Sequence, residues 1–100
     1  MLIAHITFKL APENRSPALE ALIAEAEGVC AMAGCQTFIP FLHPTDHTCV
    51  GIIHEWDTRE SFSAYIASPA FAALGNALRP LMIGPPVSKR FDATLIEGVT

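Results

Sequence analysis

The sequence predicts a two-layer α+β domain in which helices cover one face of a four-stranded antiparallel sheet. Three observations predict this class. Segments with the two-residue period of strands and segments with helical spacing follow in the order strand, helix, strand, strand, helix, strand. Apolar residues make up 51% of the 100 residues, enough for one core. No repeat, low-complexity segment or linker divides the chain, so residues 1–100 are predicted to form a single domain.

The first strand is predicted over residues 2–10, where side chains alternate loosely between two faces. Pro12 and Asn14 predict a turn, and Ser16 followed by Pro17 supplies an N-cap with proline at the first helical position. Gly34 is predicted to terminate this helix. The apolar stripe of the helix consists of Leu19, Leu22, Ile23, Ala26, Val29 and Cys30.

A hairpin follows, with strands predicted over Cys35–His43 and Thr48–Trp56 because both runs are rich in apolar residues and turn chemistry separates them. Pro40 lies inside the first of these strands and cannot donate a ladder hydrogen bond. That strand is therefore expected at a sheet edge or with a bulge.

Asp57, with Glu60 three residues later, predicts the N-cap of a short helix. The pair Ser68 and Pro69 predicts a second cap and a new helical segment ending near Arg79 or Pro80. The inward residues of the two segments are expected to be Phe62, Tyr65, Ile66, Phe71, Leu74 and Leu78. After the loop at residues 84–86, alternation over residues 89–97 predicts the last strand.

The element order βαββαβ is the ferredoxin-like, or split βαβ, plan, in which the first and third strands are central. The third strand is apolar on both of its faces, as a central strand should be. The fold class is therefore predicted to be α+β, ferredoxin-like, with a four-stranded antiparallel sheet.

Charge and composition exclude several partners. The formal net charge is -4 and the six Lys and Arg residues are scattered, so we do not expect nucleic acid as a ligand. No apolar run approaches the roughly 20 residues that span a bilayer, and no secretory signal precedes the first strand. We expect a cytoplasmic protein without membrane contact. The three cysteines are expected to be buried reduced thiols, because their spacing fits neither a disulfide framework nor a zinc site.

The predicted sheet is apolar on both faces. Helices cover one face in this plan, yet Ile39 and Phe41 oppose Phe38 and Leu42 along the second strand. Leaving either set in water would expose a patch of several hundred Å², roughly the limit for a monomer. A homodimer that pairs the open faces resolves this. The alternative is that loops of the same chain cover these residues.

These residues resemble a known family. The strand end from Ile52 to Asp57, the helix residues Phe62 and Ala64, the run Ser68–Phe71 with Leu74, and Gly34-Cys35 are similar to the antibiotic biosynthesis monooxygenase family, which includes quinol and anthrone oxygenases. The resemblance implies a dimeric α+β barrel and the oxidation of a hydroquinone, phenol or anthrone-like substrate by O₂ without any cofactor or metal.

Two departures limit the transfer. Many family members carry histidine where this chain has Tyr65 and Ala70, so a mechanism that uses either histidine does not transfer. Gly75 stands where the related haem-degrading branch has its iron-ligating histidine, which argues against haem.

The implied reaction needs a dry pocket, a base working near neutral pH and donors for a developing oxyanion. Alternation places His54, as base, and Trp56, as indole donor, on the same side of the third strand. Tyr65 adds a hydroxyl. The predicted catalytic residues are His54, Trp56 and Tyr65, and the predicted substrate-binding residues are Phe62, Phe71, Asn76 and Arg79.

Each assignment has a structural rival. His54 and Trp56 are also typical of hydrogen-bonded or core residues, Tyr65 of a hydroxyl that reaches solvent, and Arg79 of a helix-end charge. Alternation does not decide which face His5 occupies. His43 and His47 flank a hairpin turn, where solvated loop polarity is favoured over metal binding.

Three functions remain open at this point. The first is a cofactor-independent oxygenase. The second is a non-catalytic barrel, for example a stress-response protein, that binds a small apolar ligand, suggested by the missing histidines. The third is an isomerase or lyase on the same fold, which needs an acid or base but no oxygen.

Overall fold

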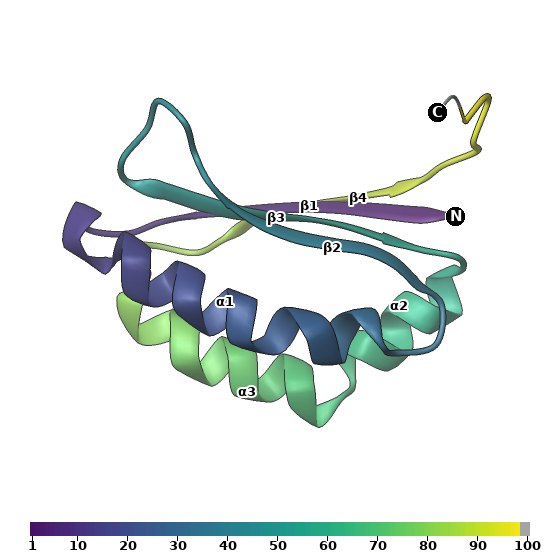
Figure 1. Cartoon of the computed structure of the whole chain (residues 1–100), viewed down its shortest axis with the longest axis horizontal. Coiled ribbons are helices and arrows are strands. Elements are labelled where there is room, and N and C mark those ends of the chain that lie inside the picture. Colours follow the sequence, from purple (N-terminus) through teal and green to yellow (C-terminus); the bar gives the residue numbers. More distant parts are fainter. Residues whose placement is uncertain (99–100) are drawn as a thin grey trace.

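A computed structural model describes residues 1–98 as one sheet with helices on one side of it (Figure 1), and residues 99–100 of the predicted domain lie outside the described part. The strands have the order β2-β3-β1-β4 and every pair is antiparallel. The fold is therefore the predicted ferredoxin-like α+β fold. The elements are β1 (Leu2–Lys9), η1 (Pro12–Asn14), α1 (Arg15–Cys30), β2 (Cys35–Leu42), β3 (Cys49–Trp56), α2 (Arg59–Ile66), α3 (Pro69–Leu78), η2 (Arg79–Leu81) and β4 (Val87–Asp92).

The edge position of β2 is confirmed. Pro40 pairs with Ile52 of β3 only, because β2 has no neighbour on its other side. The expected irregularity is also present, although at the start of the strand, where the register shifts between Cys35 and Thr37. β1 and β3 occupy the two central positions, as predicted.

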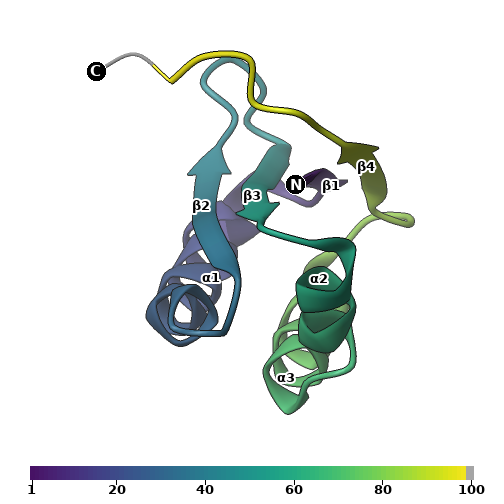
Figure 2. The same ribbon diagram turned by 90° about the vertical axis from the view of Figure 1, so that its right-hand side faces the viewer.

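The register sorts the strand residues into two faces, because residues paired across an antiparallel ladder point to the same side. Seen end-on in Figure 2, α1 and the pair α2 and α3 lie below one face. That covered face carries most of the core, and the other face is free of helices. The fully buried side chains of largest volume are Trp56, Leu10, Leu22, Val29 and Val50.

Two predicted caps shift by one or two residues. Helix α1 begins at Arg15, not at Pro17, because η1 runs directly into it. Pro17 is tolerated there since the first four helical N–H groups have no intrahelical partner. Helix α2 is capped by Thr58, whose hydroxyl accepts from the Ser61 N–H at 3.1 Å. Asp57 lies one residue before this cap, and its N–H donates to the Gly34 carbonyl at 2.8 Å.

The cap of α3 is confirmed. The Ser68 hydroxyl accepts from the Phe71 N–H at 3.2 Å, and Pro69 occupies the first helical position. The helix ends at Leu78, followed by the short helix η2 that contains Pro80. The consecutive helices α2 and α3 lie below one half of the sheet (Figure 2).

The last strand differs from the prediction of residues 89–97. β4 spans Val87–Asp92 because its partner β1 extends only from Thr7, opposite Val87, to Leu2, opposite Asp92. Beyond it, Ala93 exchanges two backbone hydrogen bonds with Met1, each 2.8 Å long. Residues 93–98 then continue without strand pairing.

Two parts of the burial prediction are wrong. Ile23 is 57% exposed, and Cys30 is also exposed although its Sγ lies 4.0 Å from the Phe38 carbonyl of β2. Of the other cysteines, Cys49 is buried and Cys35 is half-buried. Burial, reinforced by the neighbouring Cys30, raises the pKa of the Cys35 thiol to about 11, so this thiol is protonated at neutral pH.

Replacing Gly34 by alanine is expected to lower the free energy of unfolding by about 2 kcal/mol, since Gly34 has φ 83° and an added Cβ would lie 2.2 Å from Asp57 Oδ1. The matched control is Gly28→Ala in α1, where a Cβ meets nothing within 4 Å. That variant is expected to gain about 0.5–1 kcal/mol from helix propensity. Urea unfolding of both variants checks the pair, and equal effects would contradict the structure at Gly34.

Candidate functional site

The register brings one histidine and one arginine to the same row of the covered face. Ala4 of β1 pairs with His54 on one side and with Arg90 of β4 on the other. The adjacent row contains Ile52, Ile6 and Ser88. These two rows form the sheet side of a site under the helices.

A cavity of about 450 Å³ lies between these rows and the helices α2 and α3. Its volume suits a drug-sized or smaller organic ligand. Apolar side chains make up most of the wall, and the polar ones are few. The lining residues that the later argument uses are His54, Phe62, Tyr65, Arg79, Ser88 and Arg90.

His54 is held in one orientation by the neighbouring tryptophan. The side chain of His54 is 6% exposed, and Trp56 is fully buried beside it. The Trp56 indole Nε1–H donates to His54 Nδ1 at 2.9 Å. An indole nitrogen can only donate, so Nδ1 must be the acceptor and the proton of the neutral imidazole must reside on Nε2. The ring consequently has an Nε2–H donor and no free lone pair.

The protonation state of His54 follows from its surroundings. Burial, reinforced by the charges of Arg90 and His5, lowers the pKa of His54 to about 4. The expectation of a pKa near neutrality is therefore wrong. The imidazole is neutral at pH 7, and its one free lone pair is already engaged by the indole.

Aromatic rings surround the His54 imidazole on several sides. The ring centroids of Phe38, Phe62 and Tyr65 lie 5.5, 5.6 and 6.0 Å from that of His54. Tyr65 also stacks on Trp56, with centroids 5.2 Å apart and an interplanar angle of 21°. Such packing fixes the ring and excludes water from its edges.

Tyr65 is buried and lines the cavity, as predicted. Burial raises the pKa of Tyr65 to about 12, and the nearby Cys35 and Glu25 side chains add to the effect. The phenol is therefore protonated at neutral pH and does not serve as a base. The rival prediction, a hydroxyl that reaches solvent, is wrong because only 2% of the residue is exposed.

Two guanidinium groups border the cavity. The Arg90 Cζ lies 4.9 Å from the centre of the Phe62 ring, within cation–π distance. Arg79 folds back over α3, so that its guanidinium carbon lies 3.3 Å from the position a Cβ on Gly75 would occupy. Gly75 thus leaves room for the Arg79 head group.

The other predicted site residues are divided. Phe62, Phe71 and Arg79 line the cavity, whereas Asn76 is exposed and does not. Trp56 lies behind His54 and donates to it, so it contacts the site through the histidine. Arg90 and Ser88 were not predicted. Alternation had separated Phe91 from Arg90, but it could not say which of the two faces the helices.

The remaining histidines lie elsewhere. His5 is exposed on the helix-free face, with its ring against Phe91. His43 Nδ1 accepts from the Asp46 N–H at 3.0 Å, and His47 Nδ1 contacts Arg15 at 2.7 Å, so both organise the β2–β3 loop. Within residues 1–98, no three His, Cys, Asp or Glu side chains gather as a metal site.

Acid is expected to destabilise the protein through His54. The pKa of His54 is about 4 in the folded chain and 6.5 as its ordinary value, so between these values the unfolded chain binds the additional proton. Stability is then fully present above pH 6.5 and falls toward pH 4, by about 3 kcal/mol. Urea unfolding at a series of pH values measures the slope. His54→Phe should flatten the curve in this window, and an unchanged slope would contradict the burial of a neutral imidazole.

The fold and the site together define a class: small ferredoxin-like α+β domains that enclose an apolar cavity between sheet and helices. Residues 1–76 match the antibiotic biosynthesis monooxygenase family. The chain therefore belongs to that family. Comparison with curated protein sequences gives no match.

Solved structures show the same fold. A candidate antibiotic biosynthesis monooxygenase from Deinococcus radiodurans superimposes with a TM-score of 0.89 at 18% identity, covering 100% of this chain and 99% of that chain. One from Nitrosomonas europaea gives 0.88 at 14% identity, covering 95% and 100%. One from Caulobacter crescentus gives 0.86 at 20% identity, covering 94% and 90%. At such identities the likeness establishes the fold only. Among residues 1–98, no helix is both long and apolar enough to cross a bilayer.

Proposed function

We propose that the chain is a cofactor-independent monooxygenase that oxidises a small aromatic substrate, a hydroquinone, phenol or anthrone, with O₂ in the cavity under α2 and α3. The observation that carries the proposal is the His54 Nε2–H donor held in an apolar, aromatic-walled cavity. Membership of the family supports the reaction class. The family match does not name a substrate.

In the proposed reaction the substrate is its own reductant. The substrate anion gives four electrons in all to O₂. One oxygen atom is added to a ring carbon, so that a phenol or hydroquinone becomes a quinone and the CH₂ of an anthrone becomes a carbonyl. The other oxygen atom leaves as water, and its two hydrogens balance the two that the neutral substrate loses. His54 acts as a hydrogen-bond donor to the substrate oxygen, in place of the predicted base. A donor aimed at developing negative charge in a dry site typically accelerates a reaction by about 10²–10³-fold.

The other predicted site residues, apart from Asn76, are assigned roles around His54 as a hydrogen-bond donor. Trp56 positions His54. Tyr65, Phe62 and Phe71 form the aromatic wall, and Arg79 binds a substrate oxygen at the cavity mouth. Asn76 has no part in the proposal because it does not line the cavity.

A second candidate is a barrel that binds an aromatic ligand without turnover. One observation favours it: neither His54 nor Tyr65 offers a proton acceptor to the cavity at neutral pH. The same observation weighs against an isomerase or lyase, which needs such a group. The binding protein and the oxygenase differ only in whether O₂ is consumed.

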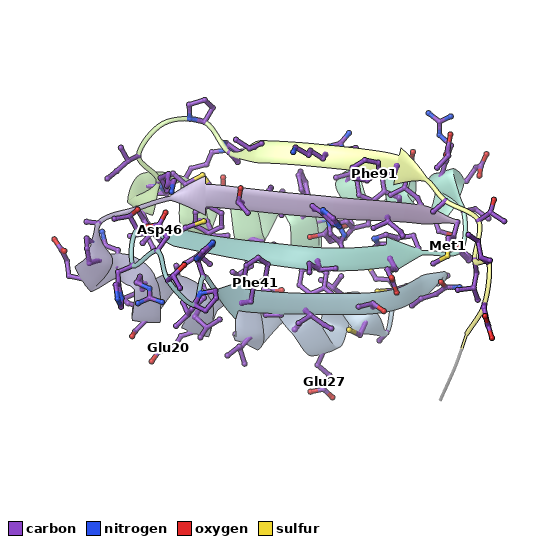
Figure 3. All side chains as sticks on the ribbon, turned by 90° about the horizontal axis from the view of Figure 1, so that it is seen from above. Met1, Glu20, Glu27, Phe41, Asp46 and Phe91 are labelled. Carbon is purple, nitrogen blue, oxygen red and sulfur yellow. The ribbon has the colours of Figure 1, made fainter. Side chains whose placement is uncertain are left out.

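We also propose that the chain forms a homodimer through the helix-free face of the sheet. Figure 3 looks onto this face, with Phe41 and Phe91 toward its opposite borders. Ile39 is 55% exposed, Ile53 40%, Phe91 46% and Val87 58%. The register joins them into one surface, since Ile39 pairs with Ile53 and Ile53 with His5 in the next strand. A second copy with the same face would bury it by two-fold symmetry.

Oxygen uptake tests the enzymatic proposal. Wild-type protein is mixed with a panel of hydroquinones and anthrones in metal-chelated buffer, and O₂ consumption is followed with an electrode. Turnover that His54→Phe reduces at least about 100-fold is the expected result. Tight ligand binding without any O₂ uptake would establish the binding protein instead. Turnover that persists without O₂ would point to the isomerase or lyase.

A further inference from the structure

Three of the polar side chains that line the cavity offer it hydrogen-bond donors and no acceptor. His54 presents Nε2–H because its other nitrogen accepts from Trp56. Arg79 and Arg90 have guanidinium groups, which donate only. Among residues 1–98, no Asp or Glu side chain lines the cavity, and the lining side chains that both donate and accept are the Tyr65 and Ser88 hydroxyls.

The donors are not spread evenly. His54 and Arg90 share the row that crosses β3, β1 and β4, separated by the small side chain of Ala4. Arg90 rests on Phe62, whose ring lies 5.6 Å from the His54 ring. One ligand oxygen between these two side chains would receive a neutral donor from one and a charged donor from the other. Phe62 supplies a flat apolar surface beside that position.

Arg79 marks a second position. It lies on the other side of the cavity, at the end of α3, where Gly75 leaves space for its guanidinium. An aromatic ligand that extends from the sheet toward α3 would therefore have the Arg90 guanidinium group near one end and the Arg79 guanidinium group near the other. The arrangement favours ligands with negative charge, because two guanidinium groups border the cavity and no carboxylate among residues 1–98 lines it. A neutral phenol O–H would find acceptors among the lining side chains only in the Tyr65 and Ser88 hydroxyls.

We propose that the cavity selects its aromatic ligand as an anion already formed in solution, a phenolate or an enolate, with His54 and Arg90 holding the charged oxygen. The substrate class of the proposed oxygenase is then the acidic phenols and enols, those substantially ionised at neutral pH. Turnover rests on the proposed function, but anion selection is a property of binding and does not need it. No side chain has to remove the substrate proton.

The test uses 4-nitrophenol, whose absorbance reports its ionisation, and 4-nitroanisole, its methyl ether, which cannot ionise. The full-length protein is titrated with each across a range of pH. We expect the apparent pKa of bound 4-nitrophenol to fall by at least about one unit, equivalent to at least tenfold tighter binding of the anion than of the neutral phenol. 4-Nitroanisole should bind at least tenfold more weakly than the anion.

Arg90→Gln should reduce this preference to less than about threefold while the fold, measured by circular dichroism, is kept. Arg59→Gln is the matched control, because Arg59 is an exposed arginine on α2 that pairs with Asp92 at 3.6 Å and does not line the cavity. It should leave the preference unchanged.

Three results would overturn the inference: an unchanged or raised pKa of the bound phenol, equal loss in both arginine variants, or no binding of either probe to the wild type at millimolar concentration. Anion selection without O₂ uptake would remove only the oxygenase. O₂ uptake from substrates bound equally well as neutral phenols would remove only the inference.

Discussion

Replacing Trp56 by phenylalanine is expected to lower the free energy of unfolding by about 2–4 kcal/mol and the rate of the proposed oxidation by about 10-fold to 100-fold. Two physical causes act together. The smaller ring leaves a void in the core where Trp56 is fully buried, and it removes the donor to His54 Nδ1. Freed from that donor, the imidazole can place its proton on either nitrogen, so the Nε2–H no longer always faces the cavity.

A double-mutant cycle separates the hydrogen bond from the packing. Trp56→Phe, His54→Phe and the double variant are unfolded in urea above pH 6.5, with circular dichroism as the signal because the substitution removes the single tryptophan. The expected coupling between the two side chains is about 1 kcal/mol or more. A coupling near zero would show that the indole and the imidazole act independently, and the assignment of the Nε2–H tautomer would then fail.

Placing lysine at both Ile39 and Ile53 is expected to weaken the proposed dimer at least about 100-fold. The two positions are neighbours on the helix-free face, so each subunit would bring two charges to a two-fold interface and like charges would meet. Both side chains are substantially exposed in the single subunit, so the substitution should leave the subunit fold intact. Sedimentation equilibrium measures the dissociation constant.

Ile23→Lys is the matched control for the dimer variant. Ile23 is 57% exposed, close to the 55% of Ile39, but it lies on α1 and away from the sheet. This variant should sediment as the wild type does. A wild-type protein that stays monomeric at high concentration, with its spectrum intact, would remove the proposed interface, and an equal effect of Ile23→Lys would show that the loss of affinity is not specific to this face.

The strands and the sheet order could be predicted because their signals are local and strong. The alternation in β1, the proline at position 40 and the apolar β3 leave few other arrangements. The capping residues were harder. Asp57 and Thr58 are adjacent and both residue types cap helices, so the local sequence does not choose between them.

The limits of β4 and the pairing of the site also depend on distant contacts. The end of β4 at Asp92 depends on where its partner β1 begins. The periodicity of the residues near Asp92 carries no information about that position. His54 and Trp56 were predicted to share a face. The hydrogen bond between them, and the burial that lowers the pKa of His54, depend on the positions of the rings in the folded chain. Arg90 was not predicted as a site residue. Alternation divides the residues of β4 between two faces, but it does not show which face the helices cover.

The measurement that tests the central claim most directly is the ¹H–¹⁵N NMR spectrum of the His54 ring at pH 7, with and without a bound 4-nitrophenolate. The structure predicts a neutral ring protonated on Nε2, with Nδ1 in the hydrogen bond from Trp56, and an Nε2–H signal that moves when the anion binds. A charged ring, a proton on Nδ1, or an Nε2–H signal unaffected by a bound anion would contradict it.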